Sequence, residues 1–88
     1  MTNLEIASAL GYACIFSSDY IDASDNLFRL ISKKQCGYDE GADYWIKCIN
    51  QLLDSDYDFK ESNEMLNLTH SKDYWKQVLI RLKKLLAQ

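Results

Sequence analysis

Residues 73–86 have the sequence DYWKQVLIRLKKLL, which is the pattern of an amphipathic α-helix. Its apolar side chains recur every three or four residues, at Trp75, Val78, Leu79, Leu82, Leu85 and Leu86. This spacing places them on one helical face, whereas a β-strand would divide them between two faces. Lys83 and Lys84 fall in the last turn, where cations are favourable beside the helix dipole. The sequence therefore predicts a terminal helix that starts after Ser71.

Two segments before it show the same spacing. One helix is expected to start near Asp39 and Glu40, because acidic residues favour a helix N-terminus. Its apolar positions are Ala42, Trp45, Ile46, Ile49, Leu52 and Leu53. Another is expected after Ser17-Ser18-Asp19, a typical capping sequence. It would carry a stripe of Tyr20, Ser24, Leu27, Phe28 and Ile31. Gly37 is expected to supply the left-handed residue that ends this helix.

The first helix and a short fifth one are predicted from their capping residues. Thr2 and Glu5 form a capping-box pattern, and the first helix should continue to about Phe16. Gly11 within it indicates that a neighbouring helix approaches closely at that point. Asp58 and Glu61 have the same capping pattern before a short helix over residues 59–66. In that helix we expect Phe59, Met65 and Leu66 to face inward.

Together these segments predict an all-α fold. The chain has 88 residues, no proline and three glycines, and that length suits a single domain spanning residues 1–88. We expect a small four-helix bundle, with a short fifth helix as an option. Its core should include Leu10, Leu27, Ile31, Trp45, Ile49, Leu52, Trp75, Leu79 and Leu82.

Neither catalysis nor metal binding is indicated by the residues present. His70 is the only histidine, and no carboxylate or nucleophile partner for it is evident in the sequence. The aspartates in Asp54-Ser55-Asp56-Tyr57-Asp58 resemble the start of a calcium loop. The glycine and glutamate that such a loop needs are replaced by Phe59 and Met65. We therefore expect no enzyme activity, no metal and no cofactor.

The three cysteines indicate a reducing compartment. Cys14, Cys36 and Cys48 are odd in number and irregularly spaced, so they do not form a disulfide framework. Cys14 and Cys48 lie among apolar residues and should be buried, while Cys36 beside Gly37 should be exposed. No signal peptide or membrane span is apparent, because the apolar stretch of residues 7–16 is short. The expected location is the cytoplasm.

Charge is strongly segregated along the chain. The net charge is −3 and the isoelectric point is about 4.9, which disfavours direct binding to nucleic acid. Residues 39–64 contain eight acidic residues and two lysines, a net charge of −6, whereas residues 72–88 carry +4. We expect a basic protein partner to bind the acidic segment at Asp54, Asp56, Tyr57, Asp58, Glu61 and Glu64. Two alternatives remain: the acids form a solvated face, or the basic helix, Lys72 to Lys84, forms the interface.

Several features resemble the colicin D immunity family and its relatives encoded with contact-dependent inhibition toxins. They are the break at Phe16-Ser17-Ser18, the helix over residues 21–31, Cys48 in a helix that ends in an acidic loop, and the terminal helix. The resemblance implies a helical, non-enzymatic bacterial protein that covers the basic active site of a tRNA-cleaving toxin. It also implies that Asp54, Asp56 and Asp58 contact that toxin, with Glu61 and Glu64 beyond them.

Two other functions are compatible with the sequence. The first is a small regulatory or adaptor protein that forms a homodimer through an aromatic patch near Tyr44 or Tyr57. The second is a protein that mimics DNA and binds a DNA-handling enzyme. Gene order and oligomeric state would distinguish the adaptor from the immunity protein.

Overall fold

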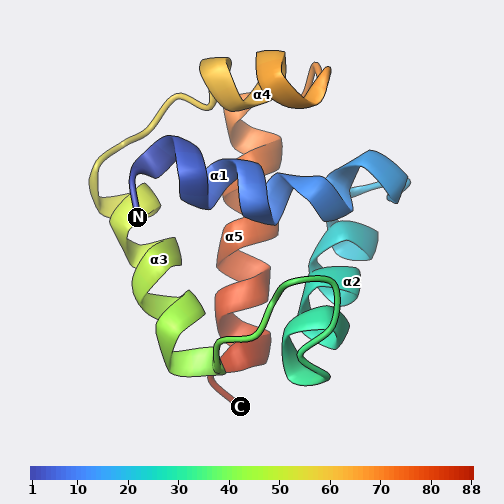
Figure 1. The fold of residues 1–88 in the computed structure, drawn as a ribbon. Coiled ribbons are helices and arrows are strands. Elements are labelled where there is room, and N and C mark those ends of the chain that lie inside the picture. The colour runs from blue at the N-terminus through green and yellow to red at the C-terminus, as the bar shows by residue number, and fades with distance from the viewer.

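The computed structural model describes all 88 residues and contains helices but no strands (Figure 1). Its elements are α1 (Asn3–Gly11), the 3-10 helix η1 (Tyr12–Phe16), α2 (Tyr20–Ser32), α3 (Ala42–Asp54), α4 (Lys60–Leu66) and α5 (Lys72–Leu86). The predicted all-α fold is confirmed, including the short fifth helix. None of the helices combines the length and apolar character that crossing a bilayer would require.

Helix α5 is the centre of the arrangement. Helices α2 and α3 lie on either side of it, and α1 crosses it on a third side (Figure 1). Helix α4 packs against α1 near the N-terminal end of α5. Nineteen buried apolar residues form one core between these helices. All nine residues predicted for the core are among them.

Gly11 allows α1 to cross α5 at close range. A Cβ atom at this position would lie 2.6 Å from Cδ1 of Leu66 and closer still to the ring of Trp75. Only glycine leaves room for the indole there, so the predicted close approach is confirmed. The prediction that one α-helix continues to Phe16 is wrong, because η1 replaces it after Gly11. Ser17 ends η1 with extended backbone, and its hydroxyl donates to the carbonyl of Ala13.

Side-chain caps begin α2 and α5 as predicted. The amide of Asp22 donates to Asp19 at 2.8 Å, and the amide of Tyr74 donates to Ser71 at 3.1 Å. Helix α2 ends earlier than expected, because Lys34, with φ of 53°, takes the left-handed position at its end. Gly37 also has a positive φ, of 87°, but it lies in the loop that follows. The amide of Gln35 then reaches back to the carbonyl of Leu30, which is the bonding of a Schellman motif.

The starts of α3 and α4 differ from the prediction. Helix α3 begins at Ala42, so Asp39 and Glu40 lie in the preceding loop. Helix α4 has no capping box: Phe59 occupies the cap position, and Asp58 accepts from the amide of Lys60. The reason is that the Phe59 ring is drawn into the core, where it stacks on Trp75 with centroids 4.8 Å apart. Met65, expected to face inward, is 63% exposed.

Candidate protein-binding site

The predicted site spans the end of α3, the following loop and α4. Its six residues differ in exposure. Asp54, Asp56, Asp58, Glu61 and Glu64 are exposed, and Tyr57 is half-buried. The loop between the two helices is held by Phe59, whose side chain is buried at 1% exposure. A buried anchor at one end fixes where the neighbouring carboxylates lie.

The Asp56 carboxylate is exposed but forms ion pairs with lysines of the same molecule. Its carboxylate lies 2.6 Å from Nζ of Lys72 and 3.6 Å from Nζ of Lys76, both on α5. The hydrogen bond from Lys72 and the charges of the two lysines lower the pKa of Asp56 below its ordinary value of 3.8. The acidic loop and the N-terminal part of the basic helix are therefore in direct contact. The sequence had suggested them as rival surfaces.

Tyr57, one of the predicted partner-binding residues, is only partly exposed. Its ring packs edge-on against Phe59, with centroids 5.0 Å apart and planes at 75°. Its hydroxyl oxygen is buried and has no hydrogen-bond partner, and burial raises the pKa of Tyr57. Only part of the ring is available to a partner, so the exposed carboxylates dominate the chemistry of this surface.

Four carboxylates at the site remain unpaired. The only ion pairs in the structure join Asp56 to Lys72 and Lys76, and Asp25 to Arg81. We call the four exposed, unpaired residues Asp54, Asp58, Glu61 and Glu64 the acidic patch. Lys60 is the one exposed cation within the same segment. Nowhere in the fold do three His, Cys, Asp or Glu side chains come together as they would around a metal ion.

His70 has a structural environment. Its ring stacks on Tyr74, with centroids 3.8 Å apart and planes at 10°, and burial lowers the pKa of the imidazole. Its backbone carbonyl accepts from the amide of Asn63 at 2.8 Å, and Asn63 in turn accepts from the indole of Trp75 at 2.8 Å. These contacts join α4 to the start of α5.

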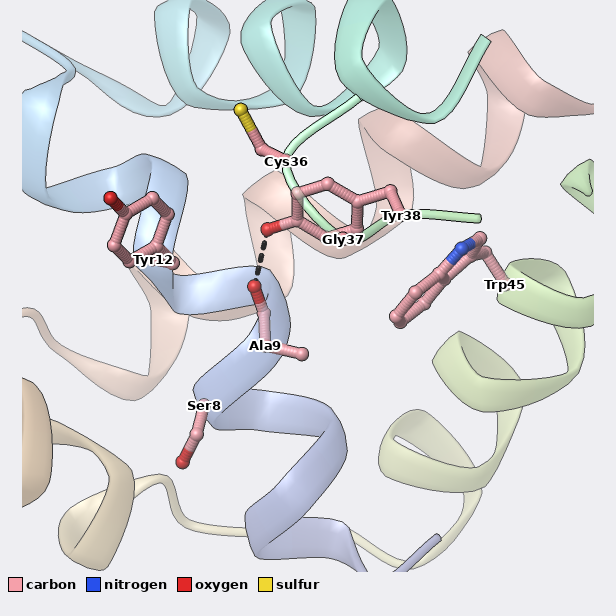
Figure 2. A pocket seen from close by; sticks show the side chains of 7 residues that line it. All are labelled: Ser8, Ala9, Tyr12, Cys36, Gly37, Tyr38 and Trp45. Atoms are coloured by element: carbon pink, nitrogen blue, oxygen red, sulfur yellow. Dashed lines mark hydrogen bonds between the residues drawn. The ribbon is translucent and has the colours of Figure 1, made fainter. Parts of the chain in front are cut away.

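A second surface, which the sequence analysis did not anticipate, is apolar. An open groove of about 640 Å³ is lined by Ser8, Ala9, Tyr12, Cys36, Gly37, Tyr38 and Trp45 (Figure 2). Tyr38 crosses it and donates its hydroxyl to the carbonyl of Ala9. A smaller groove of about 250 Å³ shares Tyr12 and Cys36 with the first. It is completed by Ala13, Phe16, Asn26, Arg29 and Leu30.

This apolar surface was missed because residues 12–16 were expected to continue a buried α-helix. In the 3-10 conformation Ala13 and Cys14 are buried, but Tyr12, Ile15 and Phe16 are exposed. Tyr44 and Tyr57, near which an aromatic patch was predicted, are both partly exposed. The exposed aromatic side chains are Tyr12, Phe16 and Tyr20. The irregular run Tyr-Ala-Cys-Ile-Phe, without a polar residue, was the available signal.

Comparison with known proteins yields no relative. No family model matches this chain, and neither a curated protein nor a solved structure shows significant similarity to it.

Proposed function

We propose that this chain is a non-enzymatic inhibitor of the immunity type, which binds a basic nuclease toxin domain through its acidic patch. The observation that carries the proposal is that Asp54, Asp58, Glu61 and Glu64 are exposed and have no cationic partner within the molecule. Four negative charges on one short segment repel each other, and a cationic partner would relieve that repulsion.

The chemistry of the target favours this partner class. A nuclease must hold phosphates in a positive groove, and carboxylates can occupy such a groove in their place. His70, the only histidine, stacks its ring on Tyr74, an environment that suits a structural role. Blocking access to substrate requires only a fitted surface of opposite charge, and charge complementarity also speeds association.

The internal contacts of the loop suit it for such binding. Asp56 is held by Lys72 and Lys76, and Phe59 is stacked on Trp75. A segment fixed before binding loses less conformational entropy when it binds. In this proposal Asp56 and Phe59 position the loop, while the acidic patch makes the contacts with the toxin.

Capture from host extract with three immobilised proteins tests the proposal. They are the wild-type chain, the patch variant Asp58→Lys/Glu61→Lys, and the matched control Asp39→Lys/Glu40→Lys. The control changes charge by the same amount at two exposed residues outside the patch. We expect a basic nuclease to bind the wild type and the control but not the patch variant, and binding should weaken with salt.

The captured protein is then assayed for RNA cleavage with and without the chain. Inhibition by wild type and control, and its loss in the patch variant, supports the immunity role. Capture of the same proteins by all three chains would refute it, as would a captured nuclease that remains active at saturating inhibitor.

A further inference from the structure

Helix α2 carries a polar stripe whose charge reverses at its midpoint. Asp19, Asp22, Asn26, Arg29 and Lys33 are spaced alternately by three and four residues, so they line one side of the helix. Two acids lie before Asn26 and two bases lie after it. The four charged residues are exposed, and none of them takes part in an ion pair. We call these five residues the α2 stripe.

The stripe borders the exposed aromatic surface of η1. Asn26 and Arg29 line the smaller groove together with Tyr12 and Phe16. The side-chain amide of Asn26 donates to the hydroxyl of Ser17 at 3.1 Å, which fixes η1 beside α2. Phe16 is 72% exposed, and its ring packs edge-on against Tyr12 with centroids 5.7 Å apart.

Three of the five residues of η1, Tyr12, Ile15 and Phe16, are large apolar side chains exposed to solvent. Tyr12 and Phe16 line the groove together with Asn26 and Arg29 of the stripe. Contiguous exposed apolar surface rimmed by polar residues is typical of a protein–protein interface.

We propose that this face joins two copies of the chain in a twofold-symmetric dimer, with the axis passing close to Asn26. A twofold axis there sets the two α2 stripes antiparallel. Asp22 of each copy then faces Arg29 of the other, and Asp19 faces Lys33. Since Phe16 lines the same groove as Asn26, the two Phe16 side chains lie near the axis and are covered by the partner copy.

The charge reversal selects a second copy over other occupants. A partner whose surface carries charges of only one sign would be attracted by one half of the stripe and repelled by the other half. A second copy matches both halves, because a twofold interface brings the same patch from each subunit together. The dimer leaves the acidic patch free, since the α3–α4 loop and α2 lie at opposite sides of the molecule (Figure 1).

Sedimentation velocity of the full chain over a range of concentrations tests the dimer. We expect the wild type to dimerise and Phe16→Glu to remain monomeric. The matched control is Ile80→Glu, because Ile80 is an exposed apolar residue on α5 that lines neither apolar groove. It should dimerise like the wild type. A monomeric wild type would overturn the proposal, as would a Phe16→Glu chain that still dimerises.

Charge exchange tests the antiparallel arrangement. Arg29→Glu places an acid opposite Asp22 of the other copy, and Asp22→Lys places a base opposite Arg29 of the other copy. Each variant alone should dimerise at least about a hundredfold more weakly, because like charges then face each other. Mixed together, they should form a one-to-one heterodimer. Failure of the mixture to associate, with helicity intact by circular dichroism, would refute the arrangement.

Discussion

Lys72 and Asp56 form an ion pair, with 2.6 Å between Nζ and the carboxylate oxygen. The pair joins the first turn of α5 to the loop that follows α3, and Lys76 adds a second contact at 3.6 Å. Part of the negative charge that the sequence assigns to the loop is thereby balanced within the molecule. What remains for a partner is the acidic patch on either side of Asp56.

Replacing Lys72 with methionine should raise the pKa of Asp56 toward 3.8, because the strongest contact that lowers it is removed. Asp56 has a lower pKa in the folded chain than in the unfolded chain. The stability it contributes is therefore present above about pH 4 and is lost as the pH falls through the lowered pKa. Wild type and Lys72→Met should then converge in stability at acidic pH. Carboxyl chemical shifts in an NMR titration give the pKa directly, and an unchanged value would contradict this prediction.

Gly11→Ala should destabilise the fold by about 1–3 kcal/mol, because the added methyl group overlaps the Trp75 ring and Leu66. Gly41→Ala is the control, since nothing lies within 4 Å of a Cβ at that position and its φ is −77°. It should cost less than about 1 kcal/mol. Urea unfolding of both variants measures the difference. Equal changes in the free energy of unfolding for the two variants would mean that α1 can move away from α5 without a loss of stability.

Asn63→Ala should cost about 1–3 kcal/mol, because it leaves the indole N–H of Trp75 without an acceptor in a buried site. It also removes the donor to the carbonyl of His70. Gln77→Ala is a suitable control, because Gln77 is exposed on α5. Its effect should stay within about 0.5 kcal/mol. Thermal or urea unfolding gives both values, and the Trp75 indole resonance should shift in the Asn63 variant.

One thiol should react quickly in the folded protein. Cys14 and Cys48 are buried, and burial raises the pKa of Cys14 to about 12 and also raises that of Cys48. Cys36 is exposed. A chromogenic disulfide reagent at neutral pH should therefore label one cysteine rapidly and all three after unfolding. Rapid labelling of a second cysteine in the native protein would show that the core opens more readily than its packing indicates.

The sequence was sufficient for the helices and the core because both depend on apolar periodicity. The apolar face of residues 75–86 can be identified without knowing what it packs against. The close approach of another helix at Gly11 can be predicted in the same way. Positions that depend on tertiary contacts were not predictable. Phe59 takes a left-handed conformation to reach Trp75, and Lys34 ends α2 in place of Gly37. The intrinsic backbone preferences of phenylalanine and lysine do not favour a left-handed conformation.

The candidate site was predictable in position but not in its contacts. The acidic residues are evident from their density along the chain, whereas the pairing of Asp56 with Lys72 links residues far apart in the sequence. The exposure of Tyr12 and Phe16 depends on the change from α-helix to 3-10 helix after Gly11. The only sign of this exposure in the sequence is the unbroken run Tyr-Ala-Cys-Ile-Phe, which does not show where the α-helix ends.

The position of Cys36 has a practical consequence for measurement. Its side chain lines both apolar grooves and is the only exposed thiol. A fluorescent or paramagnetic probe can therefore be attached to the natural sequence, without first replacing the other cysteines. Such a probe would sit beside Tyr12, between the Trp45 end of one groove and the Phe16 end of the other. Its spectrum would report directly on whether that side of the molecule is open to water or covered.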